Sequence, residues 1–396
     1  MRIDSVSARS VQDTRGKPTI ETTLVANEFS AIASVPSGKS TGSHEALELR
    51  DADGGVQTAI ANVEGEIRRA LIGRDFASPD LIDSLLIELD GTPDKSRLGA
   101  NAILSVSIAA QRLFAHAADI PLWKAIAERA GTTPNSPRLY VNMMNGGAHA
   151  DFRLPFQEHI LVVAGAASVA LPIAHEAFIK LGERLGANVP MGDEGGYAPT
   201  LAALDEPFEL LDALVEEFPG TSIAVDAAAS ELFRDGHYHL LGRAYSADDL
   251  AREYVRLVDQ FPFHSIEDPF AEDAHDDFAA LTASIGDRVL IIGDDFTVTD
   301  PLRIKNAVEH QEINAVLIKP NQIGTVGEAI KAVQMTYAAG WEAVCSHRSG
   351  ETDDTFIADF AYGVGAHGIK AGGLGQRERL EKYERLLAIE REAEAG

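Results

Sequence analysis

A repeated unit of one apolar run followed by one charged residue dominates the second half of this 396-residue chain. Four of these runs end in Asp294, Lys319, His347 and Lys370, which lie 25, 28 and 23 residues apart. That spacing is the length of one strand, one helix and two loops, so the pattern indicates successive βα units. The strands of such units end at the same edge of a sheet, and their terminal residues are expected to meet there.

The number of units predicts a closed barrel. Two earlier runs end in Asp226 and Glu267, and two further strands are expected between residues 139 and 165. A (β/α)8 barrel takes roughly 250 residues, and its catalytic groups come from the carboxyl ends of several strands. We therefore expect an α/β protein with a catalytic (β/α)8-type barrel over residues 136–396.

The first third of the chain follows a different pattern. Three short runs rich in Val, Ile and Thr predict an antiparallel meander at residues 2–11, 19–26 and 30–35. Apolar residues at helical spacing follow from Val56 to Leu71 and from Ala100 to Ala118. The segment 131–137 contains one glycine and two prolines, a composition typical of a linker. These features predict an N-terminal α+β capping domain over residues 1–135.

Three carboxylates, those of Asp226, Glu267 and Asp294, end successive units. Any one of them alone would suit a helix cap or an exposed strand end, but three in consecutive units favour a shared site. Three negative charges close together do not all stay ionised unless a cation balances them. Oxygen ligands without His or Cys favour Mg²⁺. The sequence therefore predicts a magnesium site at the barrel mouth.

Positive charges follow on the next strands. Lys319, Lys370 and Arg348 facing a divalent cation suggest a ligand with several negative charges, such as a carboxylate with a phosphate. A partly desolvated lysine beside other positive charges has a lowered pKa and acts as a base near neutrality. Acids for the opposite face are available from Glu194, in a glycine-rich loop, and from Glu158.

Composition narrows the class of protein further. The chain has 61 acidic and 34 basic residues, and its net charge of −27 disfavours binding to nucleic acid. The single cysteine, Cys345, has no intramolecular partner, and the N-terminus lacks the apolar stretch of a signal peptide. The longest mostly apolar run, residues 160–174, is shorter than the about 20 residues that cross a bilayer. We expect a cytoplasmic protein without nucleic-acid or membrane partners.

Six longer motifs resemble the enolase family. They are Val35-Pro-Ser-Gly-Lys-Ser-Thr-Gly42, Gly192-Asp-Glu-Gly-Gly-Tyr-Ala-Pro199, Ser265-Ile-Glu-Asp-Pro-Phe270, Gly293-Asp-Asp-Phe-Thr-Val-Thr299, Lys319-Pro-Asn-Gln-Ile-Gly-Thr325 and Ser346-His-Arg-Ser-Gly-Glu-Thr352. The resemblance covers almost the whole chain. It implies an enolase-like variant of the barrel and the reversible, Mg²⁺-dependent dehydration of 2-phospho-D-glycerate to phosphoenolpyruvate in glycolysis and gluconeogenesis.

The resemblance also implies roles for single residues. Lys319 matches the base that removes the proton from carbon 2, and Glu194 matches the acid that assists loss of the carbon 3 hydroxyl. The implied metal ligands are Asp226, Glu267 and Asp294 for one Mg²⁺ and Ser40 for a second, which forms with substrate. The implied substrate-binding positions are His149, Gln157, Glu158, His347, Arg348, Ser349 and Lys370. The family further suggests a lid at residues 36–43 and a homodimer or an assembly of dimers.

Departures from the family pattern leave other readings open. Lys39 stands in the lid segment where the family usually has a small residue, and Pro155 replaces a common Asp. These changes suit a divergent paralogue that removes an α-proton from another acid. A non-catalytic binding protein on the enolase scaffold is a third reading, against which the intact acid, base and metal-binding residues argue.

Overall fold

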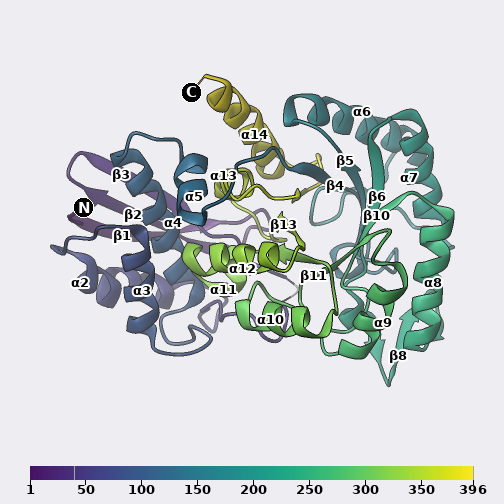
Figure 1. Cartoon of the computed structure of the whole chain (residues 1–396), viewed down its shortest axis with the longest axis horizontal. Coiled ribbons are helices and arrows are strands. Elements are labelled where there is room, and N and C mark those ends of the chain that lie inside the picture. The colour runs from purple at the N-terminus through teal and green to yellow at the C-terminus, as the bar shows by residue number, and fades with distance from the viewer. Residues whose placement is uncertain (40, 396) are drawn as a thin grey trace.

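The computed structural model describes residues 1–39 and 41–395, and it places an N-terminal α+β domain beside a closed barrel (Figure 1). Strands β1 (Ser5–Gln12), β2 (Pro18–Ala26) and β3 (Phe29–Ser34) pair antiparallel in sequence order. Asn27, in the short turn between β2 and β3, has a φ of 52°, which Asn tolerates better than most residues. The predicted meander is therefore confirmed.

Helices pack against this sheet and link it to the barrel. The long helix α4 contacts β2 and β3, and most of its residues are buried. The helical pattern predicted after Val56 contains one π-helical turn, at Val63–Ile67, between two α-helical pieces. The helices of this domain are α1 (Gln57–Asn62), α2 (Arg68–Leu71), α3 (Pro79–Asp90), α4 (Ala100–Ala117) and α5 (Leu122–Ala130).

Two contacts between distant parts of the chain hold the N-terminal domain against the barrel. The guanidinium of Arg112 donates to both carboxylate oxygens of Asp354, each at 2.7 Å. Ser37 and Gly350 exchange backbone hydrogen bonds of 2.8 and 2.9 Å. Because Gly350 lies in the loop after a barrel strand, this pairing places the segment after β3 at the barrel mouth.

Eight strands close the barrel in the order β10-β11-β12-β13-β14-β4-β5-β6. Their bounds are β4 (Arg138–Asn145), β5 (Glu158–Val163), β6 (Thr221–Asp226), β10 (Phe263–Glu267), β11 (Leu290–Gly293), β12 (Ala315–Ile318), β13 (Glu342–Ser346) and β14 (Gly368–Gly372). The six strands predicted from their charged ends and the two expected between residues 139 and 165 are all present. The predicted barrel is confirmed.

One strand runs against the others. β5 pairs antiparallel with both β4 and β6, whereas the remaining neighbours pair parallel. The first residue of β5, Glu158, lies opposite the last residue of β6, Asp226. The reversal therefore brings the start of β5, and not its end, to the mouth of the barrel.

Helices surround the barrel on the outside (Figure 1). They are α6 (Ala167–Leu185), α7 (Glu206–Glu217), α8 (Ala247–Gln260), α9 (His275–Ile285), α10 (Pro301–His310), α12 (Val326–Ala338), α13 (Phe356–Gly363) and α14 (Arg377–Ala395), with the short α11 (Pro320–Ile323) after β12. A small three-stranded sheet of β7 (Phe233–Arg234), β8 (His237–Leu240) and β9 (Arg243–Tyr245) follows β6. No helix in the described ranges is long and apolar enough to cross a membrane.

The barrel interior is filled with side chains. A cluster that includes Tyr140, Ile160 and Leu317 packs within it. At the amino ends of the strands, His264 of β10 and His367, just before β14, lie with their Nε2 atoms 2.8 Å apart. Since β10 and β14 are four positions apart in a ring of eight, this contact crosses the floor of the barrel.

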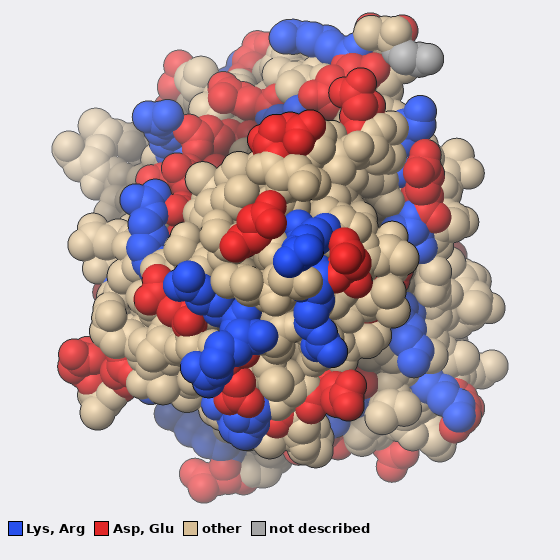
Figure 2. Space-filling view, turned by 90° about the vertical axis from the view of Figure 1, so that its left-hand side faces the viewer, with Lys and Arg blue, Asp and Glu red and all other residues tan. Residues whose placement is uncertain are grey.

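Charges of both signs mix on the N-terminal side of the molecule. Figure 2 looks onto this side, where basic side chains gather near the middle with acidic ones around and between them. An unbroken basic surface is what the nucleic-acid backbone requires, and the described residues drawn in this view do not form one.

Candidate active site

The strand ends bring most of the predicted residues to one cavity. Asp226 and Glu267 are the last residues of β6 and β10, and Asp294, Lys319 and His347 directly follow β11, β12 and β13. A small, mostly polar cavity lies at this end of the barrel. Of the residues predicted for the site, all line it except Glu267, which is buried, and Ser40, which lies outside the described residues.

Lys370 lies at the centre of one buried cluster. Its Nζ is 2.5 Å from Glu158 Oε2, 3.0 Å from Asp226 Oδ2 and 2.8 Å from Glu267 Oε1. Burial alone would lower the pKa of Lys370, but Asp226, Glu158 and Glu267 together raise it well above its usual value. Burial and the neighbouring Asp226 raise the pKa of Glu267 well above its usual range. One ammonium group thus faces three carboxylates.

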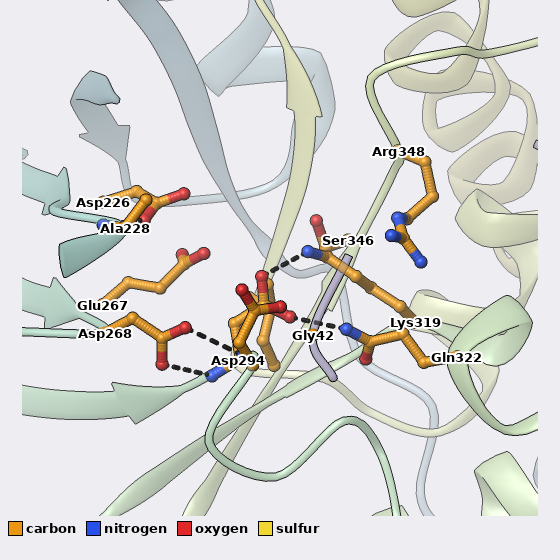
Figure 3. A network of polar contacts seen from close by, with 12 residues as sticks. Gly42, Asp226, Ala228, Glu267, Asp268, Asp294, Lys319, Gln322, Ser346 and Arg348 are labelled. Carbon is orange, nitrogen blue, oxygen red and sulfur yellow. Dashed lines mark hydrogen bonds and ion pairs between the residues drawn. The ribbon is translucent and has the colours of Figure 1, made fainter. Parts of the chain in front are cut away.

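Asp294 belongs to a second group. Lys319 contacts its carboxylate directly, and Gln322 Nε2 donates to its Oδ1 at 2.9 Å (Figure 3). The carboxylate of Asp268 accepts the backbone N–H groups of Asp294 and Asp295 at 2.9 and 2.8 Å. These three aspartates each offer an oxygen within 4.8 Å of the others. The structure therefore groups Asp294 with Asp268 and Asp295 more tightly than with the Asp226 and Glu267 predicted beside it.

The chemistry of these donors fits Mg²⁺. Burial and the charge of Asp294 raise the pKa of Asp295 to about 8 and that of Asp268 well above its usual range. Such shifts mean that the buried carboxylates exceed the positive charge available to balance them. The donor atoms are carboxylate oxygens, which Mg²⁺ prefers. In Figure 3, Asp226, Glu267 and Asp268 approach from one side, Lys319 and Arg348 from the other, and Asp294 lies between.

The electrostatics of Lys319 differ from the sequence-based expectation. A lowered pKa was expected from burial and neighbouring positive charges. Burial, Arg348 and Lys370 do lower the pKa of Lys319, but the ion pair with Asp294 outweighs them and the net shift is upward. The difference arises because Asp294 contacts Lys319, a pairing that strand spacing does not reveal.

Two glutamates face each other on the other side of the cavity. Asn142 Nδ2 donates to Glu158 Oε1 at 2.9 Å and to Glu194 Oε2 at 3.2 Å. Burial and the charge of Glu194 raise the pKa of Glu158 well above its usual value. Burial would also raise the pKa of Glu194, but His149, a hydrogen bond with Glu158 and His347 hold it well below its usual value. The pKa values of the two neighbouring glutamates are therefore shifted in opposite directions.

The predicted anion-binding residues lie on the loop after β13. The guanidinium of Arg348 is buried and donates to both carboxylate oxygens of Glu45, at 2.9 and 3.0 Å. The hydroxyl of Ser349 accepts the backbone N–H of Lys39 at 2.7 Å. Arg379 contacts Nδ1 of His347, and burial together with this charge lowers the pKa of His347 well below its usual value.

The remaining predicted residues also lie at the mouth. His149 Nδ1 is 3.3 Å from Glu194 Oε2, and Gln157 Nε2 donates to Asp226 Oδ2 at 3.2 Å. Two polar atoms of these side chains, Gln157 Oε1 and His149 Nε2, are buried without a hydrogen-bond partner among the described residues. Unsatisfied buried polar atoms around a polar cavity are typical of a site that receives a ligand.

Sequence reasoning missed five residues that shape the site: Asn142, Asp268, Asp295, Glu45 and Arg379. Asp268 and Asp295 carried a readable signal, because each directly follows a residue predicted as a metal ligand. The other three act through contacts between residues far apart in the chain, such as Arg379 with His347. No local sequence pattern predicts such contacts.

Comparison with known proteins identifies two matching family models and curated relatives. The family model described as "Enolase, C-terminal TIM barrel domain" matches residues 135–395, and the model described as "Enolase, N-terminal domain" matches residues 3–126. A curated protein named "Enolase" from Acidothermus cellulolyticus is 44% identical over 409 aligned positions. The alignment covers 98% of this chain and 94% of that protein.

Proposed function

The chain belongs to the enolase family, and we propose that its cavity converts 2-phospho-D-glycerate reversibly to phosphoenolpyruvate and water, with Lys319 as the base and Glu194 as the acid. This reaction makes the protein a carbon–oxygen lyase, a phosphopyruvate hydratase. The observation that carries the assignment of roles is that Lys319 follows β12 while Glu158, the partner of Glu194, begins β5 on the opposite side of the barrel. A substrate between them meets a base on one face and an acid on the other.

The base takes a proton from carbon 2. In its neutral form the amine of Lys319 accepts this proton, and the electron pair of the C2–H bond forms the double bond to carbon 3. Mg²⁺ held by Asp226, Glu267 and Asp294 would supply charge neutralisation for the substrate carboxylate as the proton leaves. If Asp294 held the ion, its contact with Lys319 would weaken, and this contact is the largest influence that raises the pKa of Lys319.

The acid completes the elimination. The hydroxyl of carbon 3 leaves as water when it receives a proton from Glu194. Asn142 Nδ2 donates to both Glu158 and Glu194, so the two carboxyl groups lie close together, and we propose that Glu194 takes from Glu158 the proton that it gives to the hydroxyl. The substrate loses one molecule of water. To reset the site, Lys319 releases the proton that it gained to solvent, and the glutamates take up one proton from solvent.

Positive groups position the substrate. Arg348 presents its guanidinium already oriented by Glu45, and Ser349 lies beside it, so we assign the phosphate to these two residues. Lys370 faces the carboxylate cluster and is assigned to the substrate carboxylate. His149, Gln157 and His347 complete the lining. The family supports Mg²⁺ as the cofactor, and we propose a second ion that binds with substrate at Ser40, which lies outside the described residues.

Formation of phosphoenolpyruvate tests this function directly. Pure protein with 2-phosphoglycerate and Mg²⁺ is expected to produce the rise in ultraviolet absorbance that accompanies the new double bond, and a chelator is expected to abolish it. The absence of any product from folded protein with Mg²⁺ would overturn the proposal and favour a paralogue acting on another acid. Nothing in the cavity favours the non-catalytic reading, because the acid, base and carboxylate groups all face one space.

Three further properties are proposed from family membership. A homodimer or an assembly of dimers is expected, and light scattering coupled to size-exclusion chromatography measures it. A cytoplasmic location is expected, and cell fractionation tests it. Residues 1–135 and 136–396 are proposed as the capping and catalytic domains, which the two family-model ranges support. Proteolysis within residues 131–137 is the corresponding test.

A further inference from the structure

Lys39 contacts three separate parts of the cavity rim. It belongs to the lid segment, residues 36–43. Its Nζ is 2.6 Å from Asp193 Oδ2 and donates to the backbone carbonyl of Ala148 at 2.9 Å. Its backbone N–H donates to Ser349 Oγ at 2.7 Å. A single residue therefore joins the lid segment to the loops after β4 and α6 and to the loop after β13.

The two acceptors of the ammonium group each precede a residue of the proposed active site. Ala148 is followed by His149, and Asp193 is followed by Glu194. The two backbones are themselves joined, because Asp193 N–H donates to the carbonyl of His149 at 3.2 Å. His149 Nδ1 in turn lies 3.3 Å from Glu194 Oε2. The ammonium of Lys39 thus bridges the backbone carbonyl that precedes His149 and the side chain of the residue that precedes Glu194.

The other anchors of the lid segment lie elsewhere. Ser37 pairs with Gly350 near the start of the segment, and Ser43 N–H donates to Glu272 at 3.1 Å at its end. Among the hydrogen bonds and ion pairs seen for residues 36–39 and 41–43, those of the Lys39 side chain are the ones that reach Ala148 and Asp193. Without them, the segment keeps both ends but loses its tie to the acid side of the cavity.

We propose that Lys39 is a positioning residue, which fixes the lid segment against the backbones of His149 and Glu194 and so holds the acid in place for the elimination. This inference deepens the proposed function and rests on it for the role of Glu194. The side chains of Lys39 and Asp193 are 41% and 38% exposed, so water screens the ion pair. Its loss is therefore expected to change rates about two- to tenfold and not abolish them.

Variants at both ends of the ion pair separate this role from simple attraction of an anionic substrate. Lys39→Met and Asp193→Asn are each expected to lower kcat about two- to tenfold with a smaller change in KM. The kcat of the double variant should be no lower than that of the less active single variant. Lys39→Arg is expected to restore most of the rate. If Lys39 merely attracted substrate, Asp193→Asn would raise kcat/KM by removing a negative charge, and that result would overturn the proposal.

A second measurement does not depend on turnover. Backbone hydrogen exchange in the protein without substrate is expected to speed up over residues 36–43 and 192–196 in Lys39→Met and Asp193→Asn. Lys305→Met, which breaks an exposed ion pair with Glu309 on α10, is the matched control and should leave both segments unchanged. Unchanged exchange in the Lys39 and Asp193 variants contradicts the proposal. Wild-type protein without turnover would instead contradict the proposed function, while the exchange result still decides whether Lys39 braces the rim.

Discussion

The Nε2 atoms of His264 and His367 lie 2.8 Å apart across the barrel floor, at the end of the barrel away from the cavity. The rings stack at a centroid distance of 5.1 Å, and the edge of Tyr140 packs on His264. Arg138 and Glu342 both approach Nδ1 of His367, at 3.4 and 3.3 Å. Burial, helped by Arg138, lowers the pKa of each histidine to about 4, so both rings are neutral in the folded protein.

This pair predicts that acid weakens the fold. The unfolded chain binds protons at these histidines below pH about 6.5, whereas the folded chain does not until pH about 4. The free energy of unfolding therefore falls as the pH drops through this window, by at most about 1.4 kcal/mol per pH unit for each histidine. Urea titrations at pH 7, 6 and 5 measure the slope. The variants His264→Asn and His367→Asn should reduce this slope, whereas His310→Asn, at an exposed position, should not. Equal slopes in the three variants would refute the assignment.

Lys319 as the base predicts a large loss on truncation. Lys319→Ala is expected to lower kcat by about 10²–10⁴-fold, the usual contribution of a general base. It should also stop exchange of the carbon 2 proton with deuterated solvent, which NMR follows. The control is Lys331→Ala, an exposed lysine on α12, with unchanged rate. Turnover within about tenfold of wild type would show that another group removes the proton.

Glu194 as the acid predicts that the two halves of the reaction separate. Glu194→Gln keeps the size of the side chain but has no acidic proton to give. Formation of phosphoenolpyruvate is expected to fall by about 10²–10⁴-fold, whereas exchange at carbon 2 should continue because Lys319 is intact. Loss of both activities in a folded variant would argue that Glu194 does more than protonate the leaving hydroxyl. Circular dichroism checks the fold.

The contacts of Lys370 predict that its replacement makes the stability of the fold depend more strongly on Mg²⁺. Lys370→Met leaves Glu158, Asp226 and Glu267 without their shared ammonium, and breaking such a buried pair costs about 3–5 kcal/mol. Without Mg²⁺ the variant should unfold at lower urea concentration than wild type. Added Mg²⁺ should stabilise the variant more than the wild type, because the ion no longer competes with an ammonium group. Equal stabilisation by Mg²⁺ in both proteins would contradict this account.

Much of the architecture is predictable because strand ends repeat. Charged residues such as Asp294 and Lys319 mark the carboxyl ends of strands at intervals of 23 to 28 residues, and this pattern alone indicates the barrel. The direction of β5 is not predictable in this way, because all six of its residues are buried and the pattern of apolar residues in a strand does not reveal which way the strand runs. The position of Glu158 opposite Asp226 follows only from that reversal.

Contacts between residues far apart in the chain are the other feature of the site that could not be predicted from the sequence. Arg348 was expected to face a phosphate. Its guanidinium also donates to the carboxylate of Glu45, a residue 303 positions away in the chain. The upward pKa shift of Lys319 likewise depends on which carboxylate its ammonium meets. Both results come from the closure of the barrel and its contact with the N-terminal domain, which no local pattern encodes.

The ammonium of Lys370 has a consequence for the order in which the protein matures. Because its Nζ lies within 3.0 Å of an oxygen of Asp226 and of Glu267, it offsets part of their negative charge in the folded chain before any ion is bound. We expect the barrel to close during biosynthesis without waiting for Mg²⁺, and the ion to bind afterwards to a chain that is already folded.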